Sequence, residues 1–362
     1  MRPFAPFIAV GIALCWLVPV ANAADTAPPD NAATYYRQAC DALPKGDDVD
    51  RVFDDWQKVT FDGPTIKILR QCDPALDLMQ RGASIKKCDW GLDSSKGFEL
   101  DAPELKSAKR LSQATCLKIR YLGEIKRYER IAALSADLMT LGRHLCAQRM
   151  IISRLLGSGV EASGMQAACR YLPDLPVPVL EQLRDRLAGL PEPTSLADTF
   201  RNEGRVIAAT IKLKPATIRG EPFVKDVPED SAARAQLADQ VVAAFDKAAK
   251  DVSVPLHDLA GTQMKLTMLI AQPAGGAPVG QFTAFCLSTM NEECRTLSRR
   301  SLMPAVVTLT LKGPAAIDDS RDPFGYGFGR TRIEGGWNIH ANAHDEKGKP
   351  ISLKTGPHAF DD

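Results

Sequence analysis

Apolar residues between positions 104 and 172 recur at intervals of three and four residues, which is the period of an α-helix. The clearest apolar stripe consists of Ile131, Leu134, Leu138, Leu141 and Leu145. Pro103 suits the first turn of a helix, because the N–H that proline lacks would have no partner there. Short breaks divide this central stretch into three long helices, and tight connections between such helices predict antiparallel packing.

The same spacing predicts helices on both sides of the central stretch. They cover residues 31–43, a segment that ends near 59, 63–78 with an interruption at 73–74, 178–190, 195–213, 229–250 and 253–271. Gly157, Gly159 and Gly164 weaken the third central helix as an isolated helix. Such small residues would, however, let a neighbouring helix approach closely.

The pattern changes beyond Arg299. Residues 306–312 alternate and are rich in β-branched side chains, which favours a strand, although a buried helix fits the same run. Residues 331–339 and 350–354 are predicted to pair across a turn at 345–348. The predicted fold class is therefore mainly α, an antiparallel helical bundle or helical-hairpin array with a small C-terminal β element.

Breaks in these patterns suggest a domain organisation. The expected segments are a signal peptide at 1–23, an N-terminal and central helical domain at 24–213, a linker at 214–228, a helical segment at 229–298 and a β-containing region at 299–362. The linker is assigned from its mixture of Pro, Gly and charge. A separate C-terminal domain is not required by the pattern.

The first residues of the chain have the features of a secretory signal. Arg2 supplies the positive charge, residues 7–20 the apolar core, and Ala21-Asn22-Ala23 the cleavage site. Cleavage after Ala23 would deliver the protein to the periplasm or the cell exterior. The apolar run is too short to cross a bilayer, so we expect no membrane span.

The charge balance argues against nucleic acid as a partner. The chain has 45 Lys and Arg against 44 Asp and Glu, and removal of the signal peptide takes away only Arg2, which leaves 44 of each sign. Nucleic-acid binding requires a strongly basic domain. We expect a protein partner instead, most simply another envelope protein, while the oligomeric state is left open.

The cysteine content suggests disulfide bonds. Of nine cysteines, only Cys15 lies in the signal peptide, and an even number in an exported chain favours pairing. We expect Cys286 to pair with Cys294, because they are close in sequence and flank a short polar turn. Cys72 with Cys88 is the second candidate pair.

Four short motifs resemble a group of exported bacterial helical proteins. They are Asn31-Ala-Ala-Thr-Tyr-Tyr36, Arg81-Gly82-Ala83, Cys88-Asp89-Trp90-Gly91 and Leu172-Pro-Asp-Leu-Pro176. The resemblance implies export and a helical fold, and it carries no catalytic residue over to this chain.

The segment from Asp318 to Gly329 contains two further motifs. Asp318-x-Ser320-x-Asp322 has the opening spacing of a calcium loop, but Pro323 and Gly329 replace the glycine and glutamate that such a loop needs. Asp322-Pro-Phe-Gly325 resembles the turn near the end of type II secretion pseudopilins. The pilin prepeptide and long apolar helix are missing from the sequence, so this resemblance implies only a small sheet.

Two groups of residues are candidates for binding. Asp89 and Trp90 in the third resembling motif could form a binding ledge, since indole offers an apolar face and one donor; the alternative is a Trp packed over a helix end. The central stretch is also basic, and Lys118, Arg120, Lys126 and Arg127 could form a surface for an acidic partner. The alternative for that group is a solvated helix face.

No motif points to a cofactor or metal. His340 and His344 follow a strand-like run, and four strand residues span about 13 Å, too far for one ion. Nucleophile elbows and phosphate-binding loops are missing. We therefore expect an exported helical protein that acts by binding. The alternatives are an enzyme with a cleft near Trp90 or at the junction with the C-terminal sheet, and a structural envelope component.

Overall fold

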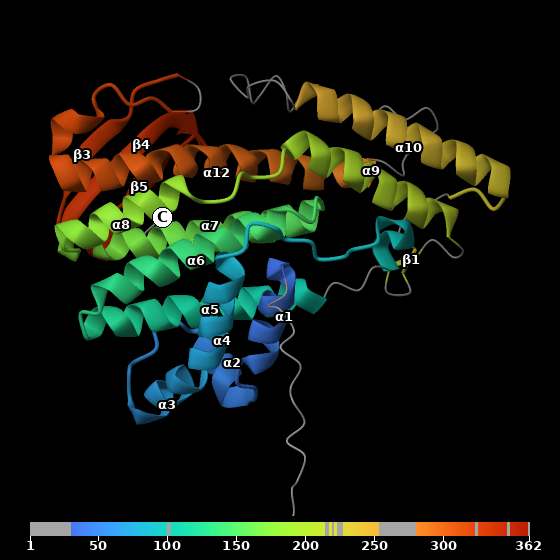
Figure 1. The fold of residues 1–362 in the computed structure, drawn as a ribbon. Helices are drawn as coiled ribbons and strands as arrows, with labels where there is room; N and C mark the ends of the chain where they lie inside the picture. Colours follow the sequence, from blue (N-terminus) through green and yellow to red (C-terminus); the bar gives the residue numbers. More distant parts are fainter. Residues whose placement is uncertain are drawn as a thin grey trace, which may run out of the picture. The chain divides into compact units, whose positions relative to one another are not determined.

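The computed structural model describes residues 30–99, 103–213, 217–218, 221–222, 227–252, 280–322, 325–345 and 348–360. The described residues from Asn31 onward form one compact unit (Figure 1). Its α-helices are α1 (Ala32–Ala42), α2 (Asp47–Asp54), α3 (Gly63–Gln71), α4 (Asp73–Ala83), α5 (Pro103–Glu124), α6 (Tyr128–Cys146), α7 (Ile151–Tyr171), α8 (Val177–Ala188), α9 (Leu196–Lys212), α10 (Ser231–Asp251) and α12 (Gly280–Lys312). This confirms the mainly α fold class.

Side chains at the helix starts explain why several helices begin where they do. The carboxamide of Asn31 accepts the N–H of Ala33 at the start of α1, and Ser195 Oγ accepts the N–H of Asp198 at the start of α9. Asp62 and Asp230 cap α3 and α10 in the same way. Each side chain satisfies one of the N–H groups that the first helical turn leaves unpaired.

Helices α6 and α7 form a closely packed hairpin that depends on glycine. A Cβ built on Gly142 would lie 2.6 Å from the carbonyl oxygen of Gly157, and one on Gly164 would lie 2.9 Å from the carbonyl oxygen of Ser135. Nothing lies within 4 Å of a Cβ on Gly159. The expected close approach of a neighbouring helix is therefore present at Gly157 and Gly164, whereas Gly159 faces open space.

Gly142→Ala is expected to destabilise the protein by about 1–3 kcal/mol, although alanine is the better helix former. The added methyl group meets backbone atoms of α7, which cannot rotate away. Gly159→Ala is the matched control and is expected to stabilise by up to about 1 kcal/mol. Urea unfolding of both variants measures the difference, and equal effects at the two positions would contradict the packing argument.

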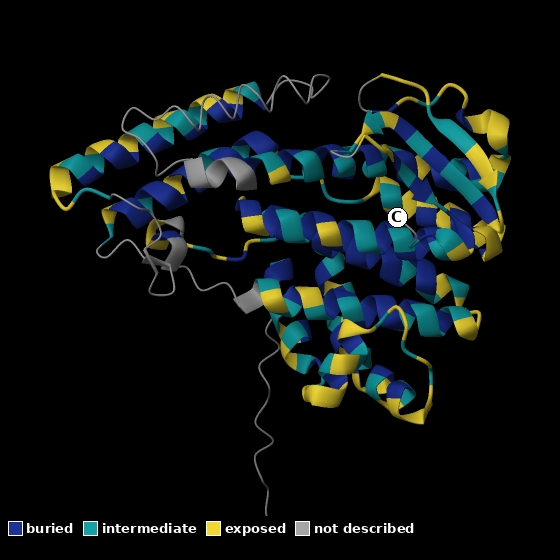
Figure 2. Cartoon of the chain, turned by 180° about the vertical axis from the view of Figure 1, so that it is seen from behind, coloured by how far each residue is buried: buried dark blue, intermediate teal, exposed yellow. Residues whose placement is uncertain are grey.

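Three apolar cores lie among these helices. The first joins helices α1 to α6, with Tyr36, Phe53 and Leu117 among its fully buried side chains. The second joins α7, α8, the C-terminal half of α12 and the sheet. The third joins α9, α10 and the N-terminal half of α12, where Phe200 packs on Phe245. Seen from behind, buried positions run along the central helices, and exposed positions gather on outer helices and loops (Figure 2).

The strand predicted at residues 306–312 is wrong, because these residues are the last two turns of α12. Leu302, Val306 and Leu309 are buried at helical spacing against the second core, so tertiary packing overrides the β-branched composition. Pro304 lies inside the helix on an exposed face. The proposed boundary between residues 298 and 299 therefore falls within a continuous helix.

The C-terminal sheet has three antiparallel strands in the order β3 (Gly329–Ile333), β4 (Gly336–His344) and β5 (Pro350–Lys354). The predicted pairing of 350–354 across the turn is confirmed, with Ile339 opposite Leu353. The run 331–339, however, is two strands, because Gly335 adopts a positive φ of 68° and turns the chain back. The sheet packs against α12 and α7 (Figure 1).

The expected disulfide bonds Cys286–Cys294 and Cys72–Cys88 are not observed, because these four cysteines are free thiols. Cys286 and Cys294 both lie on α12, where eight residues at about 1.5 Å each separate them by roughly 12 Å. That distance is beyond bridging range, because the polar turn expected between them is helical. Cys72 is buried where α3 meets α4, and Cys88 lies in the loop after α4.

Several expectations fall outside the described residues. They concern the signal peptide at 1–23, the helix at 253–271 and most of the linker at 214–228. Within that linker the described residues form the short pair β1 (Thr217–Ile218) and β2 (Glu221–Pro222). In the part of the chain that is described, no helix combines the length and apolar character needed to cross a membrane.

Candidate functional site

Asp89 and Trp90, the candidates for a binding ledge, lie in the connection after α4. Asp89 accepts the N–H of Gly91 and donates its own N–H to Asn31 at 2.9 Å, which fixes the turn. Trp90 is only 4% exposed and stacks on Tyr36, with ring centroids 5.8 Å apart. The indole therefore packs in the core and offers no exposed ledge. This agrees with the alternative in which the Trp is packed.

Tyr36, Trp90 and His144 form one buried polar cluster. The Tyr36 hydroxyl lies 2.8 Å from His144 Nδ1, and Trp90 Nε1 donates to the backbone carbonyl of His144 at 2.9 Å. Burial lowers the pKa of His144 to about 4 and raises the pKa of Tyr36 well above its usual value. Both side chains are therefore neutral at pH 7, which suits a structural hydrogen bond between helices α1 and α6.

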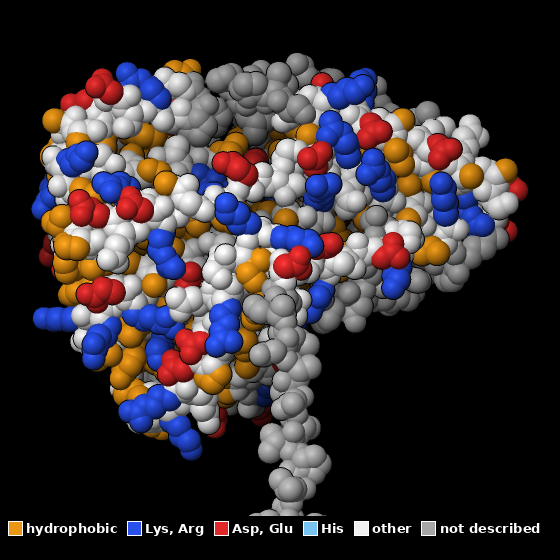
Figure 3. Space-filling model, in the orientation of Figure 1, with side chains coloured by type: hydrophobic (Ala, Val, Ile, Leu, Met, Phe, Trp, Pro, Cys, Tyr) orange, Lys and Arg blue, Asp and Glu red, His pale blue; other side chains and the backbone are white. Residues whose placement is uncertain are grey.

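The four basic candidates do not act as one free surface. Lys118 pairs with Asp73 at 2.6 Å, and Arg120 donates to the backbone carbonyl of Trp56. Lys126 and Arg127 are exposed in the turn between α5 and α6. Figure 3 shows basic and acidic side chains interspersed across the face in view, with no large field of one sign. Lys118 and Arg120 thus stabilise the fold, whereas Lys126 and Arg127 are free to meet a partner.

A buried ionic network joins α7 to α12. The Arg154 guanidinium donates to both carboxylate oxygens of Glu293, at 2.9 and 2.7 Å. Glu161, which is fully buried, accepts from Arg300 at 2.6 Å and from Arg143 at 2.9 Å. Every charge here faces an opposite charge within the core, so the network explains helix register and not ligand binding.

Two other buried acids have raised pKa values. Burial raises the pKa of Glu203 to about 7, although its carboxylate accepts the N–H of Ile151 at the start of α7. Burial likewise raises the pKa of Asp137 to about 6, and Arg186 lies 3.4 Å away. Both acids make contacts between helices, Glu203 of α9 with the start of α7 and Asp137 of α6 with Arg186 of α8.

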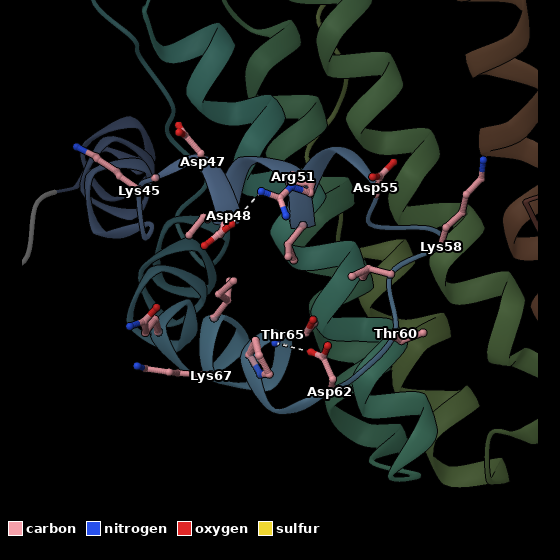
Figure 4. Close-up of a pocket in the computed structure, with 17 residues that line it drawn as sticks. Lys45, Asp47, Asp48, Arg51, Asp55, Lys58, Thr60, Asp62, Thr65 and Lys67 are labelled. Carbon is pink, nitrogen blue, oxygen red and sulfur yellow. Dashed lines mark hydrogen bonds and ion pairs between the residues drawn. The ribbon is translucent and has the colours of Figure 1, made fainter.

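A groove of about 890 Å³ lies between α2 and α3. Figure 4 shows α2 along one side, α3 along another, and the segment from Lys58 to Asp62 closing one end. Its apolar lining comes from Val49, Val52, Val59, Pro64 and Ile68. We call this hollow the α2–α3 groove.

Charged side chains of both signs surround the α2–α3 groove. They are Lys45, Asp47, Asp48, Arg51, Asp55, Lys58, Asp62 and Lys67. Arg51 pairs with Asp48 at 2.9 Å on the exposed surface, and Asp62 is occupied by the N–H of Thr65, which lowers the pKa of Asp62. Lys58 and Lys67 are exposed and available for a partner.

A smaller hollow of about 540 Å³ adjoins the groove on the other side of the α2–α3 connection. It shares Lys58, Val59 and Thr60 with the groove and is lined on its far side by Arg120 and Tyr121 of α5. Arg120 stacks over Phe61, with its guanidinium 5.2 Å from the ring centroid. The basic candidate Arg120 therefore lies beside the groove and holds its connecting segment in place.

A second large hollow, of about 660 Å³, lies where β5 meets α12 and α7. The sequence suggested a cleft at this junction with the C-terminal sheet. Its polar lining includes Arg295 and Arg299 from α12 and Lys354 from β5. The charged residues of its lining are mainly basic, whereas the rim of the α2–α3 groove has charges of both signs.

Asp318 and Asp322, the aspartates considered for calcium binding, make contacts with the strands of the sheet. Asp322 is buried and accepts the N–H groups of Tyr326 at 2.9 Å and Asn342 at 3.2 Å, while Asp318 pairs with Arg330 at 2.5 Å. Within the described ranges, no three His, Cys, Asp or Glu side chains are placed to hold a metal ion. The N–H of Asp322 donates to the Tyr326 carbonyl at 2.7 Å, while Pro323 and Phe324 of the Asp-Pro-Phe-Gly motif lie outside the described residues.

Sequence reasoning missed the α2–α3 groove, and it suggested a cleft at the junction with the C-terminal sheet without naming the residues that line it. A polar break at Pro44 to Asp48 precedes the second predicted helix, and by itself it indicates only a separation between two helices. The residues that line the hollow at β5 could not be named from the sequence, because they are far apart in it. The α12 residues that line it are also close in sequence to residues 306–312, for which a strand is predicted.

Comparison with known proteins adds no functional assignment. No protein-family model matches the chain. No curated protein and no solved structure matches it either. The chemistry of the described residues is therefore the ground for a functional proposal.

Proposed function

We propose that this chain is an exported binding protein that docks a polypeptide segment of another envelope protein in the α2–α3 groove. Export rests on the sequence of residues 1–23. The observation that carries the binding site is the groove itself, which combines an apolar floor with exposed charges of both signs. Such a combination of an apolar centre and a polar rim is typical of protein interfaces.

The charge pattern favours a polypeptide over a small charged ligand. Four basic and four acidic side chains line the groove, so no single sign dominates. A peptide segment can present opposite charges to each side of the rim while its apolar residues contact Val52 and Ile68. The buried position of Val49 and Thr65 gives the groove a fixed floor on α2 and α3.

The exposed basic pair Lys126 and Arg127 extends the proposal to a wider surface. It lies at the end of α5, the helix whose Arg120 and Tyr121 line the hollow beside the groove. A long partner could cross from the groove to this turn. Lys118 belongs to the fold through its Asp73 contact, so it is excluded from the proposed interface.

The proposal is tested by a photo-reactive residue placed at Lys67, in the full chain, within the cell that exports it. We expect one reproducible cross-linked polypeptide, and we expect none from the same probe at Lys247 on α10, which is exposed outside the groove. Adding Lys58→Glu should reduce the yield at position 67 several-fold, because the rim charge is reversed.

Thermal unfolding of each purified variant keeps binding separate from folding. Lys58 and Lys67 are exposed, so their variants should unfold near the wild-type temperature, as surface substitutions usually do. Equal cross-linking at positions 67 and 247, or a yield that Lys58→Glu leaves unchanged, would refute the groove as the docking site.

A further inference from the structure

The hollow between β5 and α12 has a distinct charge. Of the described residues that line it, four are basic, namely Arg295, Arg299, Lys349 and Lys354, and one, Asp345, is acidic. Its volume of about 660 Å³ is in the range of small-molecule sites. We call it the β5–α12 cleft.

The basic groups reach the cleft from two elements. Arg295 and Arg299 are four residues apart on α12, so they share one face of the helix. Lys354 lies on β5, and Lys349 lies in the turn just before it. Helix α12 and strand β5 are packed against each other (Figure 1). The four cations therefore line one space from two sides.

Arg299 is incompletely satisfied by the fold. Its Nε is enclosed and has no hydrogen-bond partner among the described residues. Arg295 pairs with Glu292 at 3.4 Å, whereas the Arg299 Nε–H is open to an added acceptor. A buried N–H without an acceptor is costly, and like charges one helical turn apart repel each other, so folding alone does not account for this arrangement.

The rest of the cleft is suited to an organic group. Ile351 and Leu353 are buried residues of its lining, and Pro350 and Ala359 also contribute apolar surface. A bare inorganic anion would leave most of the volume unfilled. The lining therefore fits an anionic head against the α12 arginines and an uncharged body along β5.

We propose that the β5–α12 cleft binds the phosphate group of a phosphomonoester. Guanidinium groups match phosphate oxygens in paired hydrogen bonds, and a phosphomonoester has a charge of about −1.5 to −2 at pH 7, which suits several convergent cations. The organic part of the ester lies over the apolar lining. This site is separate from the α2–α3 groove, so the proposal does not depend on the polypeptide partner.

Isothermal titration of the full chain with phenyl phosphate at low ionic strength tests the proposal. We expect saturable binding of one molecule per chain, which weakens as salt is added. Arg299→Gln should weaken this binding by at least about tenfold, because it removes a charge-assisted contact. Lys354→Gln is a second variant from the strand side, in case the first does not fold.

Lys250→Gln on α10 is the matched control, since it removes one exposed positive charge outside the cleft. It should bind phenyl phosphate as the wild type does. No saturable binding by the wild type, or an equal loss in Lys250→Gln and Arg299→Gln, would overturn the proposal. The second outcome would mean that net charge, and not the cleft, attracts the anion.

A vesicle experiment identifies the source of the phosphate. Capture of the chain by phosphatidate vesicles, reversed by phenyl phosphate, would assign the site to a lipid headgroup. Binding of phenyl phosphate without vesicle capture would assign it to a soluble ester. Both outcomes support a phosphomonoester site, and failure of both phenyl phosphate and vesicles to bind would refute it.

Discussion

Arg154→Ala is expected to lower the free energy of unfolding by about 3–5 kcal/mol, because it leaves a buried carboxylate without its partner. Arg154 and Glu293 are almost fully buried, and two hydrogen bonds join them. The Arg154 guanidinium also donates to the carbonyl of Thr194 at 2.7 Å and to Thr199 Oγ1 at 3.1 Å. The single substitution therefore breaks contacts that α7 makes with α12 and with the start of α9.

The double variant Arg154→Met with Glu293→Leu separates the value of the ion pair from the cost of breaking it. Replacing both partners by apolar side chains of similar size is often neutral or stabilising, so this variant should recover most of the lost stability. Urea unfolding followed by far-UV circular dichroism measures all three proteins. A single variant as stable as the wild type would show that Glu293 does not depend on Arg154.

Trp90→Ala should cost about 3–5 kcal/mol of stability, the range for removing a buried aromatic side chain. The indole stacks on Tyr36, donates to the His144 carbonyl and lies 5.8 Å from the guanidinium of Arg37. Its removal opens a cavity between α1 and α6 and leaves the carbonyl without its donor. Chemical denaturation of the purified chain provides the measurement.

Trp90→Phe is the control for that experiment, since it keeps an aromatic ring and loses mainly the Nε1–H. We expect it to cost about 1 kcal/mol from the hydrogen bond, in addition to the loss of ring volume. If Trp90→Ala unfolded like the wild type but lost a binding partner, the indole would be a recognition residue and the burial argument would fail.

The helical part of the fold could be predicted from local patterns. Helices α1, α8, α9 and α10 begin and end close to their expected positions, and α5, α6 and α7 are the three helices expected between residues 104 and 172. Apolar spacing and caps such as Asn31 and Ser195 are local signals. The interruption expected at 73–74 separates α3 from α4. Local propensity failed at Val306 and Val307, where burial against the second core outweighs β-branching.

The candidate sites were far less predictable. For Trp90 the sequence left a binding ledge and a packed indole both open, and for Lys118 a binding surface and a solvated face, since nothing local shows that His144 and Asp73 lie against them. The Cys286–Cys294 pair was expected because proximity in sequence was taken for proximity in space, and a helix keeps the two apart. Contacts between residues far apart in the sequence decide these cases. The spacing of residue types along a single sequence does not reveal such contacts.

The length of α12 affects how cooperatively the protein unfolds. Met290 and Cys294 pack in the third core, while Leu302 and Val306 of the same helix pack in the second. If one of these cores opened by itself, half of α12 would lose its packing while the other half kept it, and the ion pairs of Glu293 and Arg300 would fall at the junction. The helix therefore couples the sheet to α9, so the two should melt as one cooperative unit, with little partial opening between them.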